Sequence, residues 1–296
     1  MQVFFQTFIN SLQNMAIYSM ATIGIALIFR TSITTNFAQG MIGTFSAFLA
    51  SNIVLYTNPE MPFWLAIVFG ALVAFCFGYI IDAGIIRQGK AVNAYGRQMI
   101  TMGLLMIFYA VIPVIFVSIT VRTPSIPKFT FENIDFNFLG QRLYITQHAL
   151  ICVIIAFVGL SILFSMLKFT RWGIALRATA ANEPVAQMLG VNTKLMTGLT
   201  WGIAGAFIAV AASSTGMVLN SGMMGQIQIY GFLALVLGGV SSFWAPIAGS
   251  MLIPLFINYS AIITPKWSGL ISFILIMLII LIRPYGLFGK KVIRKV

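Results

Sequence analysis

Long apolar runs alternate with short polar segments along the whole chain. The run at residues 268–282 reads "SGLISFILIMLIILI", and several others approach the roughly 20 apolar residues that a helix needs to cross hydrocarbon. Short alternating strands are not apparent. The pattern predicts an all-α fold in one domain, residues 1–296: a polytopic transmembrane helix bundle with about nine spanning segments. We place them at residues 8–29, 41–56, 63–81, 99–121, 147–167, 197–219, 229–240, 245–263 and 268–282.

Two polar or glycine-rich stretches interrupt these runs. Residues 29–40, "FRTSITTNFAQG", form either a plain cytoplasmic turn or a broken helix whose free backbone groups line a solute path. Residues 233–250, "LALVLGGVSSFWAPIAGS", indicate either discontinuous helices beside a path or a tight helical hairpin. The run at 229–240 is too short to cross comfortably. We therefore expect one or two broken or re-entrant helices.

The segment at residues 197–219 carries small residues at helical spacing. Side chains of this size let two helix backbones approach closely, which is how helices associate in lipid. We expect this helix at the centre of the bundle. The small residues are Gly198, Gly202 and Ala206, with Gly205, Ala209 and Ser213 beside them.

Charge distribution sets the expected orientation. Only 7% of residues are charged and 60% are hydrophobic, whereas about a quarter of a soluble domain is charged. The net charge of +12 does not indicate a nucleic-acid partner, because Lys and Arg gather in short loops between apolar runs. With the N-terminus outside and the C-terminus cytoplasmic, all but four of the 17 basic residues face the cytoplasm. Those four are Arg122, Lys128, Arg142 and Lys266.

Few residues are suited to bond chemistry. The chain contains no Walker phosphate loop, H-E-x-x-H or G-x-S-x-G pattern, so we expect no catalytic residues, metal site or cofactor. Cys76 and Cys152 lie in apolar runs and are expected to pack. His148 is expected to be a satisfied interfacial residue rather than a proton relay, and Asp82 a solvated helix end. We expect a transport subunit rather than an enzyme.

Two loops between the spanning segments are long enough for structure of their own. In residues 168–198, Asn182 and Glu183 suit a helix start, Pro184 its first turn and Gly190 its end. This short helix would expose Val185, Met188 and Leu189, either to lie on the headgroups or to dock into a partner. Asn192 or Thr193 caps the next helix. The outer loop, residues 122–146, is expected to be an ordinary connection rather than an external cap.

Taken in order, these stretches resemble the LivH family, the permease subunits of ATP-driven importers for branched-chain amino acids. The resemblance covers nearly the whole chain. It rests on "NFAQG" at 36–40, "RATAANEPVAQMLGVNTKLMTGLTWGIAGAFIA" at 177–209, "LGGVSSFWAPIAG" at 237–249 and "RPYGLFG" at 283–289. The chain differs from relatives at Met41, where they often have an acidic residue, and has less glycine around Ser241, Ala245 and Pro246.

The resemblance implies a set of partners and site residues. The partners are a second permease, identical or paralogous, two cytoplasmic ATPase subunits that use ATP, and an extracytoplasmic solute-binding protein, in a bacterial or archaeal plasma membrane. The expected contact with the ATPase consists of Arg177, Glu183, Pro184, Ala186, Met188, Leu189 and Gly190. The expected translocation pathway passes Asn36, Phe37, Gln39 and Gly40, together with the glycine pair Gly238 and Gly239.

Alternatives to a branched-chain amino acid importer stay open. Close relatives handle urea or short amides, and the scarcity of charge in the membrane segments suits any small neutral or zwitterionic solute. A stand-alone secondary transporter or channel is the strongest rival from another class. Such proteins usually bury carboxylates or histidines to couple ions, and this chain offers little beyond Asp82 and His148.

Overall fold

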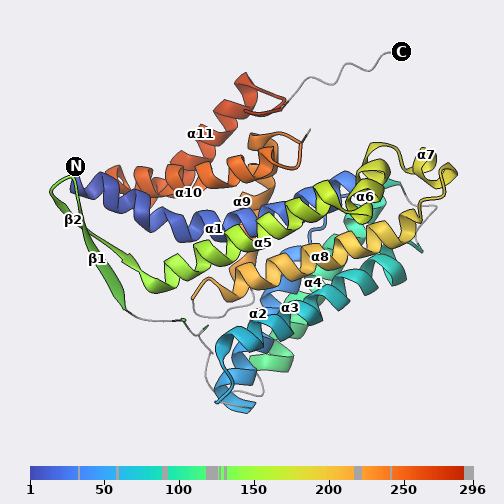
Figure 1. Ribbon diagram of the computed structural model, residues 1–296, viewed down its shortest axis with the longest axis horizontal. Helices are drawn as coiled ribbons and strands as arrows, with labels where there is room; N and C mark the ends of the chain where they lie inside the picture. The colour runs from blue at the N-terminus through green and yellow to red at the C-terminus, as the bar shows by residue number, and fades with distance from the viewer. Residues whose placement is uncertain are drawn as a thin grey trace.

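The computed structural model describes residues 1–32, 34–57, 60–88, 93–117, 126, 128–129, 132–216, 222–240 and 242–289 as a bundle of helices (Figure 1). Short π-helical turns extend three of the helices, at Ile53–Thr57, Ile81–Ile86 and Pro113–Val117. The helices are α1 (Gln2–Ser32), α2 (Gln39–Asn52), α3 (Phe63–Ile80), α4 (Ala94–Ile112), α5 (Gln147–Phe169), α6 (Arg171–Ala181), α7 (Glu183–Met188), α8 (Thr193–Ser213), α9 (Met223–Gly238), α10 (Ala245–Ile263) and α11 (Ser268–Ile282).

The predicted polytopic helix bundle is confirmed. Within the described residues, 7 helices are long and apolar enough to cross a membrane, and they include α1, α3, α4, α5, α8, α10 and α11 with their extensions. The two shorter apolar helices are α2 and α9. Most of the run at 229–240 lies in α9, which ends at Gly238 and is one of the shorter helices, as expected of a run too short to cross comfortably. Nine complete crossings stay a prediction, because α2 and α9 fall short of that length.

Helix α5 connects two different ends of the bundle. It begins directly after a β-hairpin and is followed by α6 and α7. We call these the hairpin end and the α7 end, and Figure 1 shows them on opposite sides of the molecule. Helix α1 starts at the hairpin end, where the Gln2 Nε2 atom donates to the Arg142 carbonyl at 2.9 Å. Helix α8 starts at the α7 end, three residues after Gly190.

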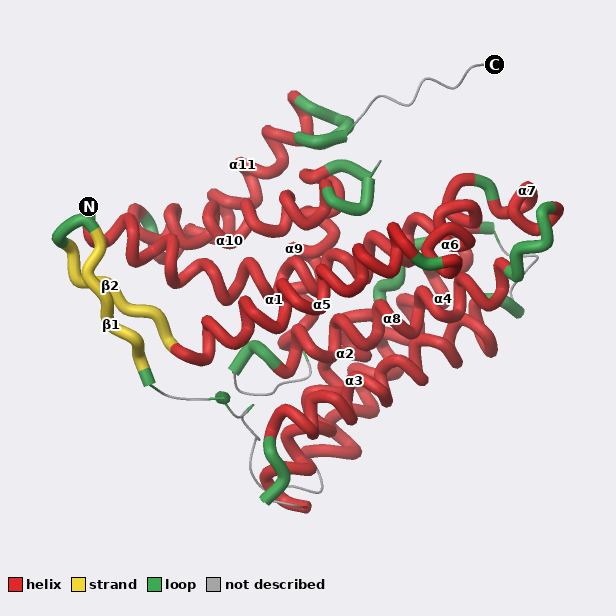
Figure 2. The backbone as a smooth tube through the Cα atoms, viewed as in Figure 1, coloured by secondary structure: helices red, strands yellow, loops and turns green. Residues whose placement is uncertain are grey.

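The hairpin itself departs from expectation. Strands β1 (Asn133–Phe138) and β2 (Gln141–Thr146) pair antiparallel and are yellow in Figure 2. Leu139 and Gly140 form a two-residue turn with φ of 50° and 74°, as a type I′ turn requires. This hairpin was not predicted from the sequence, and the expectation of an ordinary connection rather than an external cap stays a prediction. The alternation of Ile134, Phe136 and Phe138 was the available signal.

Small residues bring α8 against α3, so α8 lies at the centre as expected. A Cβ added to Gly205 would lie 2.4 Å from the Ala74 carbonyl oxygen. A Cβ added to Gly78 on α3 would lie 2.2 Å from the Trp201 carbonyl oxygen on α8. Each glycine thus allows the opposite backbone to approach, and close backbone packing stabilises helix pairs in lipid.

The chain turns back inside the bundle between α1 and α2. The Gln39 Nε2 atom at the start of α2 donates to the Ala21 carbonyl at 3.4 Å, about 15 Å along α1 from Thr31. Helix α9 starts at the same level, because a Cβ on Gly40 would lie 3.0 Å from the Met224 carbonyl oxygen. The series α1–α4 and α8–α11 therefore follow the same order: a long helix is followed by a break, a short helix and two further helices. The two series run through the bundle in opposite directions.

Candidate functional site

Helix α7 is a short helix with a defined start and stop. The Asn182 Oδ1 atom accepts a hydrogen bond from the Val185 backbone N–H at 3.3 Å, and Pro184 lies in the first turn. Gly190 ends the helix with φ of +82°, a conformation that favours glycine. The Asn192 Oδ1 atom accepts from the Leu195 N–H at 3.1 Å and so caps α8. The predicted helix, its cap and its glycine stop are confirmed.

The outer face of α7 is apolar. Met188 is 86% exposed and Leu189 75% exposed, while Ala186 is buried beneath them. The Gln187 Nε2 atom donates to the Thr193 Oγ1 atom at 2.7 Å, which fixes α7 to the first turn of α8. Exposed apolar side chains on a rigidly capped helix can pack against a partner surface or against headgroups.

A polar cavity of about 570 Å³ lies behind α7. Asp82 in this cavity is only 3% exposed and forms an ion pair with Arg87. The Thr197 Oγ1 atom donates to the Asp82 carboxylate at 3.2 Å, and Arg87 also donates to the Lys194 carbonyl. The cavity is lined by Ser32, Asp82, Ile86, Arg87, Arg97, Glu183, Pro184, Gln187, Lys194 and Thr197.

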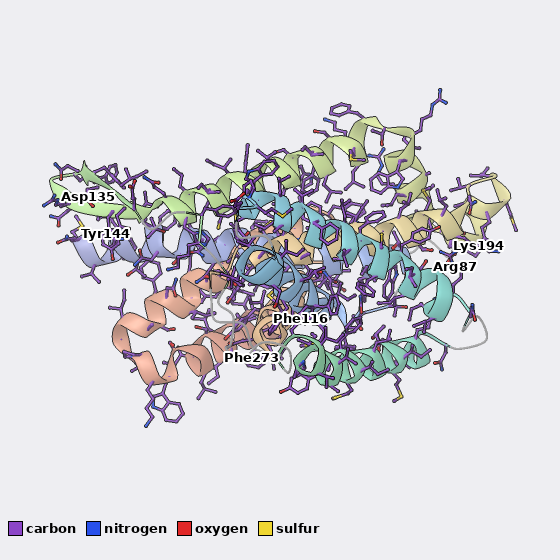
Figure 3. All side chains as sticks on the ribbon, turned by 90° about the horizontal axis from the view of Figure 1, so that it is seen from below. Arg87, Phe116, Asp135, Tyr144, Lys194 and Phe273 are labelled. Carbon is purple, nitrogen blue, oxygen red and sulfur yellow. The ribbon has the colours of Figure 1, made fainter. Side chains whose placement is uncertain are left out.

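The prediction that Asp82 is a solvated helix end is therefore wrong. The chain is π-helical over Ile81–Ile86, and the Arg87 N–H donates to the Asp82 carbonyl at 2.8 Å. The i to i+5 spacing of this turn brings the guanidinium over the carboxylate. Figure 3 shows Arg87 beside Lys194 at the α7 end. Sequence reasoning missed Arg87 and Arg97, although an Asp five residues before an Arg at the end of an apolar run was a readable signal.

Arg177 is separated from the other residues expected to contact an ATPase. It lies on α6 and lines a second cavity of about 730 Å³, together with Arg30 and Lys168. The six remaining residues of that group, from Glu183 to Gly190, lie on α7 or at its end. The structure thus brings together all of the predicted contact residues except Arg177.

The segment between α1 and α2 is buried, so it is not a plain turn at the surface. Asn36 is buried, and its Oδ1 atom accepts from the Ala38 N–H at 3.0 Å. The Gln228 side chain of α9 donates to the carbonyls of Asn36 and Phe37, at 2.8 and 2.9 Å, and accepts from the Gly40 N–H at 2.7 Å. Gln228 was missed by sequence reasoning, because one amide in an apolar run gives no indication of a distant partner.

Gln39 is the least satisfied of the predicted pathway residues. It is buried, and its Nε2 atom bonds to the Ala21 carbonyl. Its Oε1 atom is buried without a hydrogen-bond partner among the described residues. Phe37 beside it packs against Phe232 of α9, with ring centroids 5.3 Å apart. Buried amide oxygens are nearly always bonded, so this atom has capacity for a water or a solute.

The glycine pair serves close packing at the far end of α9. A Cβ on Gly238 would lie 2.0 Å from the Ala245 carbonyl oxygen, and Gly239 has φ of +111°. The Phe288 N–H donates to the Gly238 carbonyl at 3.0 Å. Helices α9 and α10 thus form a tight hairpin here. Gly238 lies about 15 Å along α9 from Gln228, so the structure separates the two groups of predicted pathway residues.

His148 is satisfied, as expected, and it is buried at the start of α5. Its Nδ1 atom accepts from the Phe129 N–H at 3.2 Å, and its Nε2 atom lies 3.2 Å from the Ser214 carbonyl oxygen. The ring lies beside Phe129, and Cys152 is one turn further along α5. These contacts connect the start of α5 with the end of α8.

Comparisons with known proteins identify the family of the chain. The profile of the family described as "Branched-chain amino acid transport system / permease component" matches residues 7–280. The chain is 26% identical to the branched-chain amino acid permease protein BraD of Pseudomonas aeruginosa and 24% identical to LivH of Escherichia coli, each over 99% of this chain and 98% of the relative. It is 27% identical to a probable LivH of Methanocaldococcus jannaschii, over 94% of this chain and 91% of the relative. No solved structure matches. The chain belongs to the family of permease components of branched-chain amino acid transport systems.

Proposed function

We propose that this permease is the membrane-spanning subunit of an ATP-binding-cassette importer for branched-chain amino acids. Its partners are a second permease, identical or paralogous, two cytoplasmic ATPase subunits and an extracytoplasmic solute-binding protein. The observation that carries the proposal is α7: a capped helix of six residues, Glu183–Met188, that presents exposed apolar side chains at one end of the bundle. Such a projection suits docking into a groove of an ATPase subunit.

Contacts between α7 and α8 can transmit a displacement of α7 to the bundle. Gln187 bonds to Thr193 at the start of α8, and the cavity behind α7 contains the Asp82–Arg87 pair. Arg87 connects that pair to the Lys194 carbonyl of α8. Since α8 packs against α1, α2 and α3, displacement of α7 by an ATPase would be transmitted to the core helices.

Charge placed on the exposed face of α7 tests the docking. Met188→Asp with Leu189→Asp should abolish co-purification of the ATPase subunit, because two carboxylates cannot be buried against an apolar groove without a large desolvation cost. Met188→Leu with Leu189→Met is the matched control, since it keeps size and apolarity. Co-purification of the aspartate variant at the level of the control would exclude α7 as the docking element.

We place the solute path beside the break between α1 and α2. The buried, unpartnered Oε1 atom of Gln39 supports this placement, because it can accept a hydrogen bond from an ammonium group. Gln39→Met retains the length of the side chain and removes the acceptor. It should raise the KM for uptake several-fold while the ATPase still co-purifies. An unchanged KM would remove Gln39 from the path. Gly238 and Gly239 border the path in this proposal, but added side chains there would disturb packing and so test folding instead.

Reconstitution with the ATPase and binding protein distinguishes the substrates and the transport classes. Proteoliposomes should take up radiolabelled leucine when ATP is enclosed, and an imposed ion gradient should not replace ATP. The names of BraD and LivH and the few charges in the membrane segments support this substrate. Uptake of urea instead of leucine would reassign the solute. Uptake driven by an ion gradient without ATP would indicate a secondary transporter.

A further inference from the structure

The basic cavity at the α7 end lies away from α7 itself. It has a volume of about 730 Å³ and is formed where α1 ends, α5 meets α6, and α9 connects to α10. Its three cationic residues come from three different helices, α1, α5 and α6. They are Arg30, Lys168 and Arg177.

Positive charge in this cavity is not neutralised by the described residues. No Asp or Glu lies among its lining residues, and the ion pairs found in the described part of the chain belong to Arg87 and Arg142. Arg30 is partly buried and lies over the Phe243 ring, 4.0 Å from its centroid. Lys168 and Arg177 are exposed and Arg30 is half-buried, so an anion can reach all three cations, and several cations lining one cavity hold an anion more strongly than a single cation does.

An apolar groove continues from the basic cavity along the outside of the bundle. It has a volume of about 470 Å³ and shares three lining residues with the cavity, namely Ser161, Phe164 and Trp244. The groove runs between α1, α5 and α10, and all but two of its lining residues are apolar. One of the two polar residues, Ser19, donates its hydroxyl to the Ala16 carbonyl at 2.8 Å. The groove therefore offers a mainly apolar surface, and its other polar residue, Ser161, lies where the groove meets the basic cavity.

The dimensions of the two cavities fit one lipid. Phe164 and Trp244 lie at the junction between the basic cavity and the apolar groove, and their rings stack with centroids 3.6 Å apart. The part of the groove on α1 runs from Ser19 to Leu12, which lie about 16 and 27 Å along the helix from Arg30, so the groove has room for an acyl chain that spans the ~15 Å thickness of one hydrocarbon leaflet. Phe157 and Ile162 of α5 are exposed, so this side of the bundle faces the surroundings of the protein. An acyl chain in the groove would place its phosphate among the three cations.

We propose that this composite site binds one anionic phospholipid, with its phosphate held by Arg30, Lys168 and Arg177 and an acyl chain in the groove between α1, α5 and α10. The headgroup fits because the cavity is cationic, and the chain fits because the groove is apolar and opens from the cavity. Neither feature depends on the identity of the transported solute. A bound lipid would join α1, α5, α6 and α10 at the α7 end.

Native mass spectrometry of the purified full-length permease with added phosphatidylglycerol or phosphatidylcholine tests this site. The wild type should retain phosphatidylglycerol at least several-fold more than phosphatidylcholine. Arg30→Gln with Lys168→Gln should abolish that preference. The matched control is Arg171→Gln with Arg283→Gln, which removes the same charge from exposed residues at the same end but outside the cavity. The control should keep the preference.

A second variant separates the lipid from a free anion. Ser161→Trp fills the junction while leaving all three cations in place, so it should lower retention of phosphatidylglycerol several-fold. Equal retention by the wild type and the Arg30/Lys168 variant would overturn the proposal. Displacement of the lipid by inorganic phosphate would also overturn it. So would a disulfide between two copies of the Ser161→Cys variant in membranes, because it would show that a second copy covers the groove.

Discussion

Buried polar side chains replace the helical hydrogen bonds that are lost where α1 turns into α2. Gln228 alone satisfies three backbone groups there, the carbonyls of Asn36 and Phe37 and the N–H of Gly40. We expect Gln228→Leu to destabilise the protein by about 1–3 kcal/mol for each group left unpaired. Thermal unfolding in detergent measures the change. Gln226→Leu on the exposed side of the same helix should leave the melting temperature nearly unchanged, and equal effects of both variants would contradict this role.

Two ion pairs of opposite character, one buried and one exposed, lie in the described part of the chain. Asp82 and Arg87 are 5% and 22% exposed in their side chains, whereas Asp135 and Arg142 are 55% and 79% exposed. Asp82→Asn should cost about 3 kcal/mol, because it leaves a largely buried guanidinium without its counter-charge. Asp135→Asn should cost less than ~1 kcal/mol, since water screens an exposed pair. Chemical denaturation of both variants compares them, and a larger effect of Asp135→Asn would refute the ranking.

Local sequence predicted the local features of individual residues well. The cap by Asn182, the stop at Gly190 and the exposed side chains of α7 all depend on neighbours within a few positions. The contacts of Gln228 and Asp82 do not depend on sequence neighbours in this way. Gln228 meets Asn36 192 positions away in the sequence, and Asp82 meets Arg87 because of a π-helical turn. Neither the distant contact nor the turn type is visible in a hydrophobic pattern.

Contact between helices α3 and α8 depends on backbone approach at glycine. A Cβ at Gly78 would lie 2.2 Å from the Trp201 carbonyl oxygen, so Gly78→Ala should push the two helices apart. We expect a loss of about 1–3 kcal/mol, as for other overpacked positions, measured by thermal unfolding in detergent. Gly159→Ala is the control, because its Cβ would meet only the Phe207 ring at 3.5 Å. Equal stability of the two variants would mean that the α3–α8 contact is looser than described.

The stop of α7 depends on a left-handed residue. Gly190 and Gly103 both have open space around an added Cβ, but only Gly190 has a positive φ, +82°. Gly190→Val should therefore strain the chain by about 1 kcal/mol or more, speed hydrogen exchange of the α7 amides and reduce solute-stimulated ATP hydrolysis. Gly103→Val should change neither measurement. Normal exchange and normal hydrolysis in Gly190→Val would show that α7 needs no such stop.

At the scale of elements, length and apolar periodicity predicted the existence of the long helices but not their connections. Helix α6 was not separated from its loop, because only 11 residues lie between the caps at Thr170 and Asn182. The hairpin alternates over six residues, which is easily overlooked beside runs of 20. For the segment between α1 and α2, the sequence left two alternatives, a plain cytoplasmic turn or a broken helix inside the bundle. The contact of α9 with the buried Asn36 favours the second.

At the scale of the whole molecule, the two ends of the bundle should face opposite sides of the membrane. The basic residues Arg30, Arg87, Arg97 and Lys194 all line cavities at the α7 end, as expected for a cytoplasmic side. We expect an impermeant maleimide to label Asp135→Cys but not Met188→Cys in intact cells. Both variants should be made after replacing Cys76 and Cys152.

Lysis should expose Met188→Cys, which is the control for its reactivity. Labelling of Met188→Cys from outside would reverse the predicted topology. Asn58 and Lys291 are further positions for the same test, at predicted outer and inner sites, and they lie outside the described residues.

The contact between Gln228 and the segment at Asn36 imposes an order on biosynthesis. The two residues are 192 positions apart, and translation at about 5–20 residues per second separates their synthesis by roughly 10–40 s. During that interval the carbonyls of Asn36 and Phe37 lack the amide that satisfies them in the finished bundle. Helix α1 must likewise wait for α8, against which it packs. The first half of the chain therefore leaves the ribosome as an incomplete bundle. The insertion machinery must keep its unpaired polar groups away from lipid until α9 has been synthesised.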